Sequence, residues 1–133
     1  MAPTYRELVG RYANTFADTS GANCFAATLG VALRRPREIF PLWLHQEPFL
    51  RALRGGGFRP TGDRDPRPGD AAVWADPGGL PVHAAFCVGD GLMFNKYGQG
   101  WEQPYAVVSL DDLRDFDGIV TGGGSMTVYR RQR

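Results

Sequence analysis

The chain has 133 residues, of which 43% are hydrophobic and 22% charged, the composition of an ordinary globular protein with a self-sufficient core. We therefore expect one domain covering residues 1–133. Its 15 Lys and Arg residues are balanced by 14 Asp and Glu residues, and this net charge of +1 argues against a protein that binds nucleic acid or a membrane surface.

Targeting signals and cysteines are sparse. The first 20 residues lack the charged start and apolar run of a secretory signal, and no stretch reaches the length of a membrane span. The two cysteines, Cys24 and Cys87, are enough for one bridge but do not resemble a disulfide framework. We expect a cytoplasmic, reduced protein, and export as part of a larger system stays open.

Helices are expected in the first half of the chain. Apolar spacing and capping residues predict them at Tyr5 to about Tyr12, Cys24 to about Arg35, and about Pro48 to Arg54. Pro36 ends the second helix, and residues 39–44 are apolar but broken by proline. His45, close to the third helix, is interpreted as a surface or packing residue.

Strands are expected after a connector, residues 59–70, that is rich in proline and charge. The pattern predicts strands at Ala71–Ala75, Val82–Val88, Leu92–Tyr97, Tyr105–Ser109 and Met126–Tyr129, and a short helix at Leu110–Phe116. Gly89-Asp90-Gly91 predicts a tight hairpin turn. Helices followed by strands indicate an α+β domain, with the helices on one face of an antiparallel sheet of about five strands.

Cys24 is the first candidate for chemistry. It follows Asn23, a good cap residue, and would lie in the first turn of a helix that is apolar on most of its circumference. The positive end of the helix dipole favours a thiolate there. Alternatively, Cys24 is a small hydrophobe in a core helix.

His83 is the second candidate, near the start of a predicted strand. Alternation places His83, Ala85 and Cys87 on one face of that strand, and the small side chains would suit a closely packed helix. A histidine there can take the proton of a cysteine at the helix N-terminus and later protonate the leaving group. It can equally be a hydrogen-bonded core or edge histidine.

Asn95 lies across the predicted hairpin from His83. Its side-chain oxygen can accept a bond from the imidazole N–H and so orient the ring, as a neutral counterpart of Asp. Because Lys96 follows it, the position can also be a solvent-facing one. Asp70 is expected to cap or brace the first strand, and Cys87 to be buried and inert.

The order of these residues resembles the papain-like NlpC/P60 cysteine peptidases and the related CHAP amidases, over about Tyr12 to Asn95. Tyr12 lies twelve residues before Cys24, and Asn95 twelve after His83, as in the NlpC/P60 family. The strand entry Arg67-Pro68-Gly69-Asp70 and the His83 strand ending in Gly89 are also similar. The resemblance implies a papain-like NlpC/P60 fold, a Cys24-His83-Asn95 triad, and an oxyanion hole made by the Tyr12 hydroxyl and the Cys24 backbone N–H.

Departures from the family concern the substrate. Asn23-Cys24-Phe25-Ala26 stands where the family usually has Asp-Cys-Ser-Gly. Side chains that would wall the cleft and bind substrate are Phe25, Trp74, Tyr97 and Trp101, with residues 99–103 as a loop over it. For Tyr12 the alternative is helix packing, and for Trp74 it is a place in the core.

Three functions are compatible with this pattern. The first is a cysteine peptidase or amidase that cleaves an amide in a small peptide or a peptidoglycan-like substrate through a thioester. The second is a thiol acyltransferase using the same triad, and the third is a non-catalytic binding domain. No metal or other cofactor is expected, because Cys24, Cys87, His45 and His83 lack zinc-like spacing and no glycine-rich phosphate loop is present.

Overall fold

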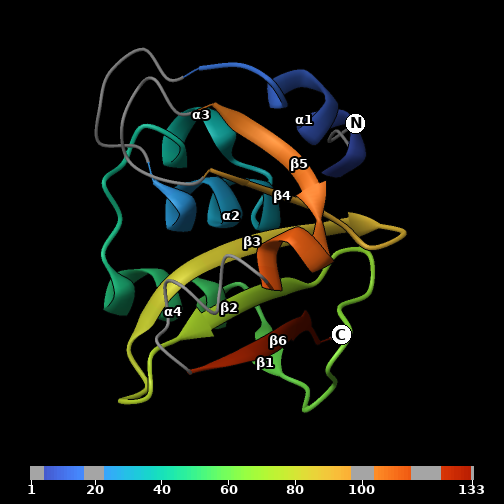
Figure 1. The fold of residues 1–133 in the computed structure, drawn as a ribbon. Helices are drawn as coiled ribbons and strands as arrows, with labels where there is room; N and C mark the ends of the chain where they lie inside the picture. The colour runs from blue at the N-terminus through green and yellow to red at the C-terminus, as the bar shows by residue number, and fades with distance from the viewer. Residues whose placement is uncertain (1–4, 17–22, 97–103, 115–123, 133) are drawn as a thin grey trace.

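The computed structural model of the chain describes residues 5–16, 23–96, 104–114 and 124–132 (Figure 1). Its helices are α1 (Tyr5–Tyr12), α2 (Cys24–Ala32), α3 (Pro36–Ile39) and α4 (Gln46–Gly55), and residues 110–114 are also helical. Its strands are β1 (Phe58–Pro60), β2 (Ala71–Ala75), β3 (Pro81–Gly89), β4 (Leu92–Lys96), β5 (Tyr105–Ser109) and β6 (Ser125–Arg131). None of the helices in these ranges is long and apolar enough to cross a membrane.

The strands form one open sheet of six, in the order β1-β6-β2-β3-β4-β5, and all neighbours are antiparallel. The last strand, β6, therefore lies between β1 and β2. The expectation of about five strands missed β1, whose three residues pair with Tyr129–Arg131. It was hidden because Pro60 and its polar neighbours read as a connector, although proline is tolerated on an edge strand.

Two hydrophobic clusters fill the two faces of the sheet. On one face, α2 packs with residues of α4, β3 and β4, including Ala84, Phe86 and Phe94. On the other, Ala85 and Cys87 of β3 pack with Trp74 and with the 110–114 helix. The α+β prediction is confirmed, and so is the alternation along β3.

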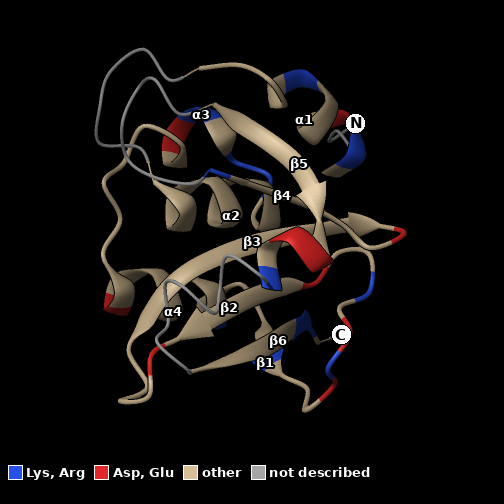
Figure 2. Cartoon of the chain, viewed as in Figure 1, with Lys and Arg blue, Asp and Glu red and all other residues tan. Residues whose placement is uncertain are grey.

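The face on which α2 packs was predicted wrongly. The helix covers the Ala84 and Phe86 face of β3, not the face shared by Ala85 and Cys87. Both faces of this strand carry small side chains, so composition could not choose between them. Figure 2 shows that the central strands β2 and β3 carry no charged side chain, as expected for strands covered on both faces.

Helix ends also differ from the predictions. α2 ends at Ala32, and Pro36 begins the short helix α3 rather than only stopping its predecessor, since proline fits the first turn of a helix. α4 begins at Gln46, just after His45, whose exposed ring lies 5.5 Å from that of Trp43. His45 is thus a surface residue, as expected.

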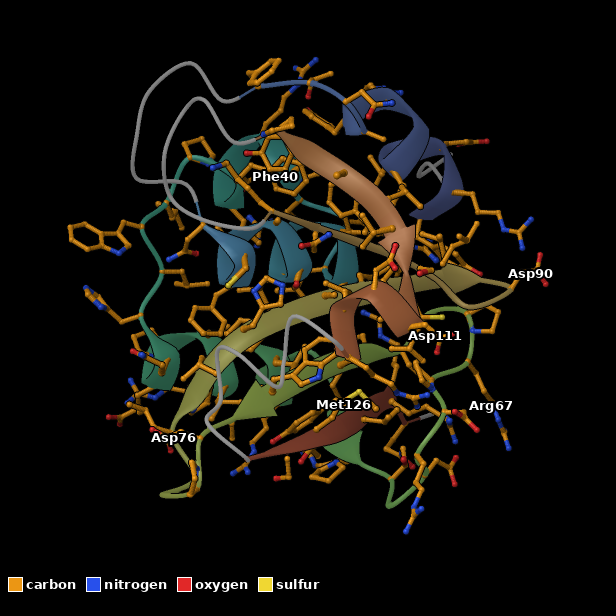
Figure 3. The ribbon with its side chains drawn as sticks, viewed as in Figure 1. Phe40, Arg67, Asp76, Asp90, Asp111 and Met126 are labelled. Atoms are coloured by element: carbon orange, nitrogen blue, oxygen red, sulfur yellow. The ribbon has the colours of Figure 1, made fainter. Side chains whose placement is uncertain are left out.

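The predicted β3–β4 hairpin is present, and Figure 3 shows Asp90 at its tip. Asp90 and Gly91 have φ angles of 54° and 72°, the pair of positive values that a type I′ turn requires. At the start of β2, the buried carboxylate of Asp70 accepts hydrogen bonds from the Arg67 N–H and from the Arg130 guanidinium, at 2.8 Å each. Asp70 therefore braces the sheet, as expected.

Candidate active site

Cys24 is the first residue of α2, and its neighbour Asn23 caps the helix. The Asn23 Oδ1 accepts a hydrogen bond from the Ala26 N–H at 3.0 Å, and its Nδ2 donates to the Leu44 carbonyl at 2.8 Å. Both halves of the amide are thus used, one to cap the helix and one to tie it to the segment before α4. These two hydrogen bonds fix the position of the cysteine backbone.

The Cys24 thiol lies against the backbone of β3. Hydrogen bonding by the backbone of Ala84, the residue after His83, favours the thiolate, as do the backbone groups of Phe25 and Cys24 at the start of the helix. Burial nevertheless dominates, because only 7% of Cys24 is exposed, and it raises the pKa of the thiol to about 11. The start of the helix therefore favours the thiolate, as expected, but desolvation outweighs this effect in the structure.

His83 and Asn95 form a hydrogen-bonded pair. The His83 Nε2 lies 3.3 Å from the Asn95 Oδ1, and the Asn95 Nδ2 donates to the Ala106 carbonyl of β5 at 3.3 Å. The carbonyl fixes which end of the amide faces the histidine, so the imidazole carries its proton on Nε2. Nδ1 is then the nitrogen that can act as a base.

The pair lies in a dry environment. Asn95 is 0% exposed and His83 3%, and the Trp74 ring packs 5.8 Å from the imidazole. Burial lowers the pKa of His83 to about 4, against the raising effect of the bond to Asn95. At neutral pH the structure therefore holds a neutral thiol and a neutral imidazole.

Strands β3 and β4 separate close to His83 and Asn95. The β3–β4 ladder runs from Gly89↔Leu92 to Phe86↔Phe94. Continued in the same register it would pair Ala85 with Asn95 and Ala84 with Lys96, but none of these residues is in the ladder. The backbone of Ala84 interacts with the Cys24 thiol instead. The structure thus brings the Cys24 thiol to the backbone of Ala84, and His83 to Asn95. The contact between the thiol and the imidazole that a triad requires stays a prediction.

Tyr12 is placed elsewhere. Its ring packs 4.7 Å from that of Phe40, which Figure 3 labels beside α3, and 6.3 Å from that of Tyr105. It also lines a pocket with residues 34–38, which follow the C-terminal end of α2, whereas Cys24 opens the N-terminal end. This is the helix-packing alternative, and the oxyanion role stays a prediction without geometric support.

The residues expected to bind substrate lie mostly in the core. Phe25 is 6% exposed and packs 4.9 Å from the ring of Phe49, and Trp74 is 1% exposed. Tyr97, Trp101 and the 99–103 loop lie outside the described residues. Cys87 is buried, with its Sγ 3.8 Å from the Pro66 carbonyl, and burial raises its pKa.

Sequence reasoning missed Lys96. It served as a sign that the end of β4 faces solvent, yet its side chain is fully buried. One signal was present: it is the only lysine in a chain whose other basic residues are all arginine.

Within the described ranges, no group of three or more His, Cys, Asp and Glu side chains is arranged to hold a metal ion. Comparison of the chain with protein-family models, with curated proteins and with solved structures found no match.

Proposed function

We propose that this chain is a cysteine hydrolase of the peptidase or amidase type, with a papain-like fold related to the NlpC/P60 domains. The observation that carries the proposal is the His83–Asn95 hydrogen bond of 3.3 Å beside a helix-terminal cysteine whose thiol meets the backbone of Ala84. A nucleophile, a base and a group that orients the base are the three parts that covalent acyl transfer needs.

In the first half of the reaction, the Cys24 proton moves to Nδ1 of His83 and the sulfur attacks the substrate carbonyl carbon. Asn95 holds the ring with Nε2–H directed at its own oxygen, which keeps Nδ1 as the base. The imidazolium then gives its proton to the leaving amine, so the amide C–N bond breaks and a thioester to Cys24 remains.

In the second half, water gives a proton to His83 and attacks the thioester, which releases the acid and restores the thiol. Each step passes through an intermediate with negative charge on the former carbonyl oxygen. The N–H groups at the start of α2, those of Cys24 and Phe25, already act on the sulfur and are the candidate donors to that charge.

The cost of ionising the pair shapes this mechanism. A thiol with a pKa of about 11 and an imidazole with one of about 4 differ by roughly 10 kcal/mol for the proton transfer, before the attraction between the two ions is counted. A pre-formed thiolate–imidazolium pair is thus not the resting state. Proton transfer accompanies the arrival of substrate.

Amide-forming acyl transfer is the second candidate, and the burial of the site favours it. Asn95, His83 and Trp74 are each no more than 3% exposed, which limits access of water to the base. An enzyme that excludes water from a thioester can pass the acyl group to an amine instead. The triad and its first half-reaction are the same for both candidates.

Acylation of Cys24 by p-nitrophenyl acetate, followed at neutral pH by peptide mass mapping, tests the shared chemistry. We expect acetyl-Cys24 in the unaltered protein and a rate lower by about 100-fold or more in His83→Ala, because the general base is lost. Cys87→Ser is the matched control, and its rate should be unchanged. If acetyl-Cys24 is absent, or if a folded His83→Ala variant is acetylated as fast as the wild type, both enzyme hypotheses are excluded and the non-catalytic binding domain is favoured.

A competing amine then separates the two enzyme candidates. Release of acetate at a rate that added glycinamide does not alter supports the hydrolase. Acyl transfer only to the amine, with the thioester stable in its absence, supports the acyltransferase.

A further inference from the structure

Lys96 is an unusual residue in this chain. It is the only lysine in the sequence, and it is fully buried. Lysine is among the residues least often buried, because its ammonium loses strong hydration. A chain that uses arginine at every other basic position therefore places its one compact ammonium group in the interior.

The side chain of Lys96 lies on the face of the sheet that α2 covers. Lys96 is two residues after Phe94, whose ring belongs to the cluster around α2, and residues two apart on a strand share a face. It also pairs across the ladder with Tyr105 of β5, another member of that cluster. By the same alternation, Asn95 points to the opposite face.

The charge of Lys96 acts on the nucleophile. Its ammonium favours the thiolate form of Cys24, in the same direction as the backbone groups around the sulfur. On β5 its partner in the ladder is Tyr105, and burial lowers the pKa of His83 on β3 to about 4, so that His83 is neutral at pH 7. His83, with its low pKa, does not supply a resting positive charge for the sulfur.

We propose that Lys96 is a positioning residue of the reaction, whose buried ammonium stabilises the negative charge that forms on the Cys24 sulfur between the α2 N-terminus and the opened end of the β3–β4 hairpin. The inference rests on the proposed function for its role in a reaction. The electrostatic coupling between the two groups can be measured without any substrate. In this arrangement the cation that accompanies the thiolate is Lys96, and His83 serves as the proton carrier.

The first experiment measures the alkylation rate of Cys24 by iodoacetamide against pH in a Cys87→Ser background. Lys96→Met removes the charge and keeps an unbranched side chain of similar length, whereas Lys96→Arg keeps the charge. We expect Lys96→Met to be about three- to tenfold slower at pH 9 and its inflection to lie at higher pH, and Lys96→Arg to restore much of the rate. A residue needed only for packing would change the Tm of these variants and leave the inflection in place.

The second experiment does not depend on any Lys96 variant folding. Because the sequence has one lysine, ¹³C-lysine labelling gives a single side-chain Cε signal, which reports the pKa of Lys96 directly. The coupling is reciprocal, so the part of the Lys96 titration that overlaps thiol ionisation, near pH 11, should move to lower pH in Cys24→Ala. Identical lysine titrations with and without the thiol, or an unmoved alkylation inflection in Lys96→Met, would overturn the proposal.

These readouts separate this proposal from the proposed function. Acetylation of Cys24 that depends on His83, together with an unmoved inflection in Lys96→Met, removes the role of Lys96 alone. A moved inflection in a protein that is never acylated confirms the Cys24–Lys96 coupling and removes the hydrolase.

Discussion

The substitution Asn95→Asp tests whether the His83–Asn95 contact controls the base. The wild-type amide oxygen faces His83 Nε2 at 3.3 Å, so a carboxylate in its place would put a negative charge within direct contact of the ring. An opposite charge at such a distance raises the pKa of a histidine by about 1 to 3. Starting from about 4, the pKa of His83 should therefore rise to roughly 5 to 7.

The Ala106 carbonyl limits this gain. It accepts a bond from the Asn95 Nδ2 in the wild type and would face a carboxylate oxygen in the variant. That repulsion raises the pKa of the new Asp and reduces its charge near neutrality, so the low end of the range is expected unless Ala106 moves. Asn95→Ala, which removes the oxygen without adding charge, is the matched control and should not raise the pKa of His83.

Proton NMR of the imidazole Cε1–H signals measures both values, because the chain contains two histidines. His45 is exposed and supplies an internal reference, and His45→Gln assigns the signals. A wild-type His83 that titrates near 6.5 while circular dichroism shows a folded protein would refute the argument from burial. An unchanged His83 pKa in Asn95→Asp would refute the contact itself.

Three further outcomes are expected. The free energy of unfolding should be highest above pH 6.5 and fall by roughly 3 kcal/mol as the pH drops towards 4, because His83 binds a proton more readily in the unfolded chain than in the folded one. Urea titrations of the wild type and His83→Gln at several pH values measure this fall. An equally steep dependence on pH in both proteins would contradict the prediction. Thr28→Val should stabilise the protein by about 1 kcal/mol, because the Thr28 hydroxyl is fully buried and has no hydrogen-bond partner in the described residues; a lower Tm would show that the hydroxyl is bonded. Gly30→Ala should destabilise it by roughly 1–3 kcal/mol, because the new methyl group would overlap the ring of Phe40, and a thermal melt with Gly10→Ala as the open-space control checks this.

Much of the local structure could be predicted because each element carries its own signal. Tyr5–Tyr12, Ala71–Ala75 and Tyr105–Ser109 have the expected limits, since caps, turns and alternation are local properties. The position of β6 between β1 and β2 could not be predicted, because sequence order does not specify which strands pair. The choice of face for α2 depended on what covers the other face, the Leu110 and Leu113 helix, which lies late in the chain.

The candidate site, too, could be predicted from the sequence only in part. The cap on α2 follows from Asn23. The His83–Asn95 contact depends in addition on a one-residue register shift between Cys87 and Gly89, which the Asp90-Gly91 turn does not specify. The protonation states do not follow from sequence, because they depend on how much water reaches the groups. A helix dipole is a local feature and favours a thiolate, whereas the desolvation that prevents one comes from the whole tertiary structure.

Charge conservation connects the proposed roles. In the proposed resting site Cys24 and His83 are neutral and Lys96 supplies the positive charge that favours the thiolate, which gives these three groups a net charge of +1. Transfer of the thiol proton to His83 leaves that net charge unchanged but places a thiolate between two cations. When the sulfur attacks, the negative charge moves to the substrate oxygen and both cations remain. A site of this kind stabilises an anionic intermediate more than its neutral substrate, which is the condition for lowering the barrier, and it does so without a resting thiolate that would be open to oxidation.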